Sequence, residues 1–125
     1  MKEIINTKNA PQAIGPYVQA IKTGNIIYVS GQIPLLPSGV LESKTISTQT
    51  TQVMKNLTSV LEAAGSSLNH VIKTTCYITD MNNFTEFNNI YNKFFNENYP
   101  ARACIEVSRL PKDVLIEIDA IALEK

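Results

Sequence analysis

Cysteine and histidine are scarce in this chain, and their scarcity argues against two common scaffolds of small proteins. The 125 residues include two cysteines, Cys76 and Cys104, and one histidine. No C-x-x-C pair occurs and no histidine stands beside either cysteine, so the sequence predicts neither a disulfide framework nor a metal site. Two free thiols are typical of a reduced, cytoplasmic compartment, and we expect one to be buried and one to lie in a site.

The chain also lacks an excess of charge and a long apolar run. Its 11 basic and 11 acidic residues give a formal net charge of zero, which argues against nucleic acid or an anionic membrane as the main partner. No apolar run approaches the roughly 20 residues that span a bilayer, and residues 1–6 contain no signal-peptide pattern. With 44% apolar residues, the composition predicts one soluble globular domain over residues 1–125.

Hydrophobic periodicity predicts an alternation of strands and helices. Apolar residues recur at helical spacing in two segments, and short alternating or β-branched runs surround them. We expect two strands that form a hairpin (17–22 and 26–30), followed by a helix that is capped by Thr45 or Ser47 and ends near Ala64. A strand (71–78) and a second helix, capped by Asp80 or Asn82 and ending near Phe95, come next. Two strands (101–107 and one beginning at 114) complete the order, with room for short strands near Ile4 and Val40.

The last two strands carry the chemically most informative residues. A turn at residues 111–113 separates them, so we expect them to form a hairpin. Matching their apolar faces places Glu117 on the same side of the sheet as Arg102 and Cys104. An arginine, a thiol and a carboxylate on one face can bind and process a small anion. The alternative is a solvated face with a weak surface ion pair.

Two further positions are candidates for contact with a ligand. Gly31 follows a predicted strand directly, where a glycine lets a ligand approach the backbone or simply allows a bulge. Asn88 lies one helical turn from Phe84 and Tyr91, so its amide is expected to be half-buried. A buried amide needs a hydrogen-bond partner, which is either a ligand or the protein backbone.

Two helices can cover only one face of the predicted sheet. The other face is expected to carry Cys104, Leu115, Ile121 and Leu123 besides its charges. That mixture is too apolar to be left in water, so we infer that a second subunit covers it. Since Arg102 is predicted to point toward the same face, the site is expected to lie between subunits.

A series of short motifs runs along nearly the whole chain. They are Ala10-Pro11, Ile14-Gly15-Pro16-Tyr17, Ser30-Gly31-Gln32-Ile33-Pro34, Glu62-Ala63-Ala64-Gly65, Val71-Ile72-Lys73-Thr74-Thr75, Tyr99-Pro100-Ala101-Arg102, Arg109-Leu110-Pro111-Lys112-Asp113 and Ile116-Glu117. Together they resemble the RidA (YjgF/YER057c/UK114) family of reactive-intermediate deaminases. The match is weaker over residues 44–55 and 96–99, where the loop before Arg102 looks shorter than in some relatives.

The resemblance implies an α+β, chorismate-mutase-like fold: a mixed sheet with two helices on one face, assembled as a homotrimer with clefts between subunits. It implies a cofactor-free enzyme that hydrolyses 2-imino acids and their enamines to 2-keto acids and ammonia. The substrates would be 2-aminoacrylate with its tautomer 2-iminopropanoate, and 2-iminobutanoate. Their expected sources are dehydratases and other pyridoxal-phosphate enzymes that release enamines.

The resemblance also assigns roles to single residues. The arginine matching Arg102 holds the substrate carboxylate, a task that suits a planar guanidinium. The glutamate matching Glu117 positions the attacking water and shuttles protons. The backbone at Gly31 and Cys104 would line the pocket. Further pocket positions of the family are matched by Tyr17, Ser30 and Asn88.

Three alternatives remain beside this interpretation. Cys104 would be a nucleophile only with a lowered thiol pKa and a base nearby, and no histidine is near it in sequence. RNA cleavage or translation inhibition, a label given to some relatives, is disfavoured by the neutral charge. A sensor that binds a keto acid or amino acid would use Arg102 equally, but it has no need of Glu117 beside the ligand's own carboxylate.

Overall fold

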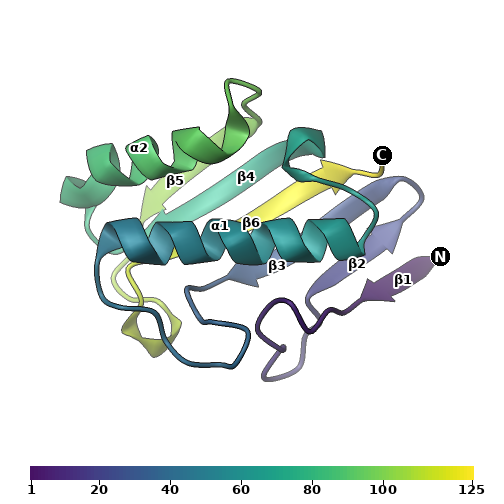
Figure 1. Cartoon of the computed structure of the whole chain (residues 1–125), viewed down its shortest axis with the longest axis horizontal. Helices are drawn as coiled ribbons and strands as arrows, with labels where there is room; N and C mark the ends of the chain where they lie inside the picture. The colour runs from purple at the N-terminus through teal and green to yellow at the C-terminus, as the bar shows by residue number, and fades with distance from the viewer.

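One six-stranded sheet forms the centre of the protein. The computed structural model describes residues 1–125, and the strands lie in the order β1-β2-β3-β6-β4-β5 (Figure 1). All neighbours pair antiparallel except β4 and β5, which are parallel. The strands are β1 (Lys2–Ile5), β2 (Ala20–Thr23), β3 (Ile26–Gln32), β4 (Val71–Ile78), β5 (Ala101–Glu106) and β6 (Ile116–Leu123).

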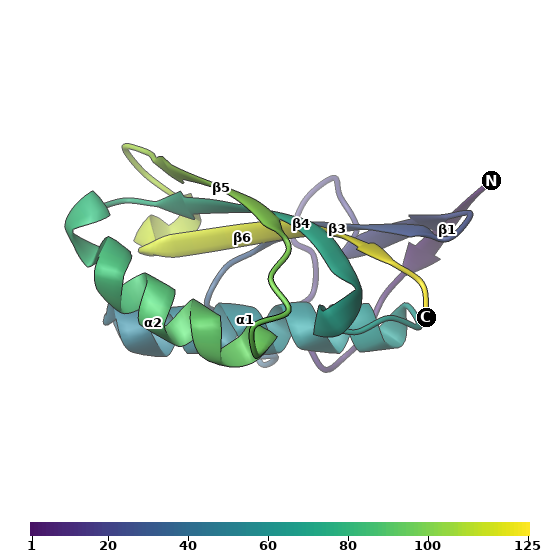
Figure 2. The same cartoon turned by 90° about the horizontal axis from the view of Figure 1, so that it is seen from above.

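Two helices, α1 (Ile46–Ala63) and α2 (Phe84–Phe95), cover the same face of this sheet (Figure 2). The Thr45 hydroxyl accepts a hydrogen bond from the Thr48 amide and caps α1. Gly65 ends it with a φ of 80°, a left-handed conformation that favours glycine. The expected mixed α+β fold, with both helices on one face, is therefore confirmed.

The core lies between the helices and the sheet. Along β6 the even-numbered residues Ile116, Ile118, Ala120 and Ala122 are buried, and the odd-numbered ones are only partly so. The helices contribute fully buried aliphatic and aromatic side chains to the same layer. These include Val53, Met54, Leu57, Val60 and Leu61 from α1, and Phe87 and Phe95 from α2.

Some boundaries differ from the sequence expectations. The strand expected at 17–22 begins only at Ala20, and before it the Val18 carbonyl accepts a hydrogen bond from the Ser30 hydroxyl. The short strand near Ile4 is present as β1, whereas near Val40 there is only an isolated bridge between Leu35 and Leu41. Asp80 caps the short 3-10 helix Met81–Asn83 that leads into α2.

The expected hairpin of the last two strands is wrong. β6 does not pair with β5; it lies between β3 and β4, and β5 pairs only with β4. The connection β4-α2-β5 explains this, because a helical crossover returns the chain parallel to the strand it left. The eight residues of β6 bury one side throughout, so β6 occupies the sheet interior while β5 becomes an edge.

This pairing also overturns the predicted common face of the site residues. Arg102 is paired with Thr74 and Cys104 with Cys76, and both partners are buried on the helix side. Glu117 is paired with Tyr77, the residue that follows Cys76 on β4. Paired residues in a sheet share a face and successive residues alternate. Arg102 and Cys104 therefore lie on the helix-covered face, and Glu117 lies on the opposite face.

The face of the sheet away from the helices, which we call the open face, carries an apolar row. Ile4, Ile21, Tyr28 and Ile121 are aligned across four strands, with Ile4 59% and Tyr28 47% exposed. Leu123 lies beside Ile26 on the same face, as expected. Two residues expected there do not belong to it, because Cys104 and Leu115 pack against the core.

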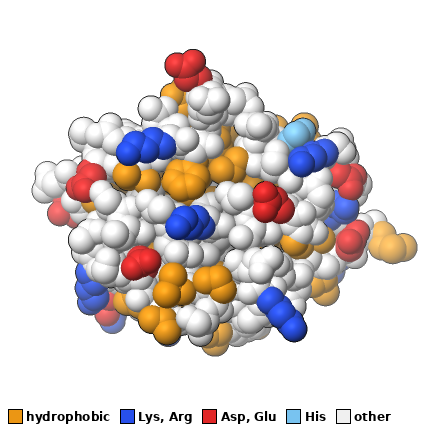
Figure 3. All heavy atoms as spheres, in the orientation of Figure 1, with side chains coloured by type: hydrophobic (Ala, Val, Ile, Leu, Met, Phe, Trp, Pro, Cys, Tyr) orange, Lys and Arg blue, Asp and Glu red, His pale blue; other side chains and the backbone are white.

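The surface shows little segregation of charge on the helix-covered face. Basic and acidic side chains are scattered among uncharged groups there, without a large area of one sign (Figure 3). None of the helices has the length and apolar character that crossing a bilayer requires.

Candidate functional site

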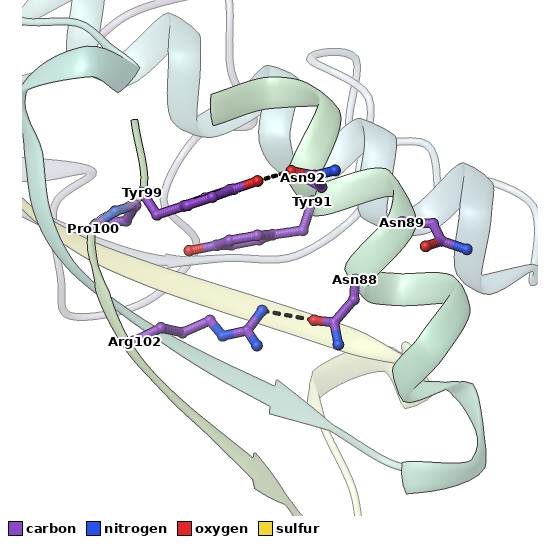
Figure 4. A pocket seen from close by; sticks show the side chains of 7 residues that line it. All are labelled: Asn88, Asn89, Tyr91, Asn92, Tyr99, Pro100 and Arg102. Carbon is purple, nitrogen blue, oxygen red and sulfur yellow. Dashed lines mark hydrogen bonds between the residues drawn. The ribbon is translucent and has the colours of Figure 1, made fainter. Parts of the chain in front are cut away.

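The Arg102 side chain lies against one face of helix α2. Its Nη1 donates to Asn88 Oδ1 at 2.8 Å (Figure 4). The guanidinium carbon is 4.9 Å from the ring centroid of Tyr91, 5.6 Å from that of Phe84 and 5.7 Å from that of Phe87. These are cation–π distances, so three rings and one amide together hold the arginine on the helix.

A cleft of about 400 Å³ opens beside this arginine. Asn96 and Glu97 adopt left-handed φ values of 47° and 67° after α2, and the chain turns back so that the Tyr99 hydroxyl donates to Asn92 Oδ1. The cleft is polar, and the Arg102 guanidinium gives it one positive charge that no acidic side chain neutralises. Its lining residues are Asn88, Asn89, Tyr91, Asn92, Tyr99, Pro100 and Arg102.

A second cleft, of about 330 Å³, lies at Glu117. It is lined by Tyr17, Ser30, Gly31, Ile33, Pro111 and Glu117. Gly31 stands at a β-bulge between β3 and β6, and a Cβ added to it would lie only 2.3 Å from Glu117 Oε2. The glycine thus admits both a bulge and a close approach, and the group that approaches its backbone is the Glu117 carboxylate.

The environment of Glu117 favours its protonated form. Burial raises the pKa of the Glu117 carboxyl, and the negative charge of Asp119, two residues along the same strand face, raises it further. The pKa of Asp119 is also raised by burial, although Tyr77, which donates to Asp119 Oδ2 at 3.3 Å, acts in the opposite direction. A carboxyl with a raised pKa is suited to taking up and returning a proton.

Cys104 has the properties of a structural thiol. It packs against the core, and burial raises its pKa despite the opposing effect of Arg102. A nucleophilic cysteine needs the reverse shift. Burial likewise raises the pKa of its strand neighbour Cys76 to about 12. Cys104 lines neither of the two clefts within one chain.

The predicted site residues thus form two groups. Tyr17, Ser30, Gly31 and Glu117 share one cleft, while Asn88 and Arg102 share the other, and the two clefts have no lining residue in common. Ser30 uses its hydroxyl to donate to the Val18 carbonyl at 2.6 Å. Within one chain, the carboxylate and the guanidinium are separated by the sheet.

Sequence reasoning missed several residues of both clefts. Asn92, Tyr99 and Pro100 lie beside Arg102, and Ile33 and Pro111 lie beside Glu117. The helical spacing of Phe84, Phe87 and Tyr91 indicates an apolar helix face, and by itself it does not show that an arginine packs on that face. The available signal was Asn88, an amide set at helical spacing among those rings, because a polar residue there indicates that the face meets something polar.

The described residues contain no cluster of three or more His, Cys, Asp or Glu side chains that could hold a metal ion. The two clefts present a guanidinium, a carboxyl, amides and tyrosine hydroxyls.

Comparison with known proteins identifies the family. The family model described as Endoribonuclease L-PSP matches residues 7–124. A RutC family protein of Pyrococcus horikoshii is 56% identical over 126 residues, covering all of both chains. The 2-iminobutanoate/2-iminopropanoate deaminase of Salmonella typhimurium is 44% identical over 128 residues, again covering all of both. The crystal structure of Escherichia coli TdcF with bound serine has a TM-score of 0.94 at 43% identity, covering 98% of this chain and 99% of that one.

The fold and the matched motifs therefore define a small α+β protein of the Rid type. The chain belongs to the L-PSP family, which contains the RutC and RidA proteins, and the resemblance seen in the sequence is confirmed.

Proposed function

We propose that this protein hydrolyses reactive 2-imino acids, such as 2-iminopropanoate and 2-iminobutanoate, to 2-keto acids and ammonia. The proposal rests on one observation: two functional groups lie in separate clefts. One cleft holds a guanidinium without an ion-pair partner, and the other holds a carboxyl that can accept a proton. Neither cleft alone holds both the carboxylate-binding group and the base, so the proposed site is formed where two copies of the chain meet.

Arg102 is proposed to bind the substrate carboxylate. Its Nη1 is engaged by Asn88, and no protein group accepts from Nε or Nη2. Those two N–H groups lie on one edge of the guanidinium and match the two oxygens of a carboxylate. Binding there fixes the imine carbon relative to the rest of the site, which is the main benefit of a two-pronged contact.

Glu117 is proposed to act on the water. As the water oxygen bonds to the imine carbon, Glu117 takes its proton and the C=N electron pair moves to nitrogen. Glu117 then returns the proton to nitrogen, which gives a carbinolamine. Glu117 next carries the carbinolamine hydroxyl proton to the amine, so that the carbonyl forms as the C–N bond breaks and ammonia leaves. General acid–base catalysis of this kind contributes about 10²–10⁴-fold to a rate.

A homotrimer is the proposed assembly. The apolar row on the open face needs a cover, and a partner copy seated there would bring its Arg102 cleft toward Glu117. Closed symmetric rings repeat one interface, so three copies would make three equivalent sites.

Two relatives support the substrate class. The Salmonella protein is named for this reaction, and the TdcF structure contains serine, an amino acid whose α-carboxylate matches that of a 2-imino acid. Both align with essentially the whole of this chain. The proposal therefore rests on the chain's own clefts and on names given to proteins at 43–44% identity.

The decisive test generates 2-aminoacrylate in a coupled assay and follows imine loss and pyruvate release with and without the protein. We expect the protein to accelerate both. Glu117→Gln keeps the shape and removes the base, so turnover should fall by about 10²-fold or more. Its binding of pyruvate or 2-oxobutanoate, measured by calorimetry, should be equal to that of the parent or tighter, because a negative charge has been removed.

Arg102 variants complete the comparison. Arg102→Ala should lose both keto-acid binding and turnover, and Arg102→Lys should be impaired in both because it loses the planar fork. Parental turnover in Glu117→Gln would contradict the mechanism. If even the parent leaves imine loss unchanged while Arg102 still governs keto-acid binding, the protein is a keto-acid or amino-acid sensor.

RNA cleavage is the second candidate, and the description of the matching family model favours it. The zero net charge disfavours it, because RNA affinity derives largely from phosphate contacts to basic residues. We expect weak RNA binding that moderate salt abolishes. RNA cleavage at physiological salt that survives further purification and disappears in Arg102→Ala would reverse this ranking.

A further inference from the structure

We propose that Phe84, Phe87 and Tyr91 of helix α2 are positioning residues that hold the Arg102 guanidinium ready for a carboxylate. We call these three residues the ring cradle. The inference rests on the proposed function, since it takes Arg102 as the carboxylate-binding group, and it concerns how that arginine acquires its orientation.

The ring cradle surrounds one side of the guanidinium. All three centroids lie within 4.9–5.7 Å of the guanidinium carbon, and two of the rings, Phe87 and Tyr91, pack at a tilt with their centroids 5.5 Å apart. Tyr91 is fixed further by its hydroxyl, which bonds with the buried Thr74 hydroxyl at 2.7 Å. Phe87 and Tyr91, both buried, are therefore the fixed part of the cradle.

The arginine is held without neutralisation of its charge. The ion pairs of the protein join Lys22 to Glu3 and Glu124, and Arg109 to Asp113, and none involves Arg102. Its partners are ring faces and one amide oxygen, all of them uncharged. Ring faces attract a cation through their quadrupole but leave its full charge available to an incoming anion.

The direction of the guanidinium follows from the same contacts. Asn88 accepts from Nη1 and the rings supply no acceptor, so the edge formed by Nε and Nη2 keeps its donors free for a carboxylate (Figure 4). A flexible arginine would lose rotamer freedom when it binds a carboxylate. An arginine that the protein already holds in place loses less, so its affinity for the carboxylate is higher. The cradle should therefore act on carboxylate affinity and KM rather than on the proton-transfer step.

The test replaces Phe84, which is only half-buried, by pentafluorophenylalanine, which keeps the ring shape and reverses its quadrupole. Phe84→Leu removes the ring altogether. Phe94 lies on the same helix, is half-buried against the core and is not among the rings in cation–π contact with Arg102, so the same two replacements at Phe94 are the matched controls. Pyruvate affinity is measured by calorimetry, kcat and KM are measured in the imine assay, and assembly is checked by light scattering.

We expect both Phe84 replacements to weaken pyruvate binding by about 2- to 5-fold and to raise KM similarly, with kcat nearly unchanged. The Phe94 replacements should leave pyruvate affinity at the parental value. Parental affinity with pentafluorophenylalanine at position 84, or an equal loss at position 94, would overturn the inference. A parent that does not turn over imine, but binds pyruvate in a Phe84-dependent way, would refute the proposed hydrolysis and support the ring cradle.

Discussion

Gly31 and Glu117 are coupled through the space that they share. The space that a side chain at position 31 would fill is taken by the Glu117 carboxylate, whose Oε2 would be 2.3 Å from a Cβ there. That distance is too short for a non-bonded carbon and oxygen, and the side chain of Glu117 is the part able to move. The identity of residue 31 thus controls where the proposed base lies.

Gly31→Ala should therefore displace the carboxylate of Glu117. We expect at least a 10-fold loss of imine turnover, with a cost in stability of about 1–3 kcal/mol from overpacking. Measured on the residual activity of the Glu117→Gln variant, the same change should have little further effect, because coupled residues are not additive. A full additional loss in the double variant would show that Gly31 acts independently of Glu117.

Asp119 should set the pH at which Glu117 works. Burial and the Asp119 charge both raise the pKa of Glu117, and a base must be deprotonated, so activity should rise with pH to a midpoint above that of a free glutamate. Asp119→Asn removes the charge and leaves the burial. We expect the acid limb of kcat/KM to move to lower pH while remaining above the free-glutamate value.

The control for this profile is Glu117→Gln, which should show no such limb in its residual activity. An unmoved or upward-shifted limb in Asp119→Asn would contradict the electrostatic coupling of the two carboxyls.

At the scale of elements, strands and helices were largely predictable and their pairing was not. The residues of β4 and the end of α2 at Phe95 were expected correctly, because β-branched runs and helical spacing are local signals. The partner of β5 is a non-local choice. The strand–helix–strand order 71–106 did contain the cue for a parallel pair, but the turn at residues 111–113 favoured a hairpin instead.

The candidate site residues could be selected from the sequence, but their arrangement could not. Arg102 and Glu117 stand out by type and by motif, but the sheet face of each depends on register against β4, which the sequence does not reveal. The ring cradle was missed for a related reason. Aromatic residues at helical spacing have the same pattern whether they contact the core or an arginine.

The link between β4 and α2 is the hydrogen bond of Thr74 and Tyr91, both buried. Thr74→Val or Tyr91→Phe should each lower the free energy of unfolding by about 1–3 kcal/mol, because one buried hydroxyl loses its partner or its bond. The double variant should cost less than the sum, since neither side is then left unsatisfied. Denaturant titration measures all three, and strict additivity would mean that this bond contributes nothing.

At the scale of the whole molecule, a second copy of the chain would meet two needs. The apolar open face needs a cover, and the cleft that holds Glu117 needs a guanidinium. One chain exposes Ile4 and Tyr28 on the face that holds Glu117, and it keeps Arg102 behind the sheet. A second copy on the open face would cover Ile4 and Tyr28 and would supply its own Arg102 to the cleft of Glu117. We therefore expect light scattering to give about 41 kDa, three times the 13.8 kDa chain, and a stable monomer at micromolar concentration would refute the assembly.

Subunit mixing tests whether the site is shared. Arg102→Ala and Glu117→Gln are each expected to be inactive, but if every site takes Arg102 from one copy and Glu117 from the next, each mixed trimer contains one intact site. Equal amounts of the two variants, refolded together from urea, should recover about a quarter of the parental activity, because three-quarters of randomly assembled trimers are mixed and each has one intact site in three. The control mixes Arg102→Ala with Arg102→Lys, which cannot restore an intact pair. If the first mixture stays inactive although native mass analysis shows mixed trimers, the guanidinium and the carboxylate do not meet between subunits.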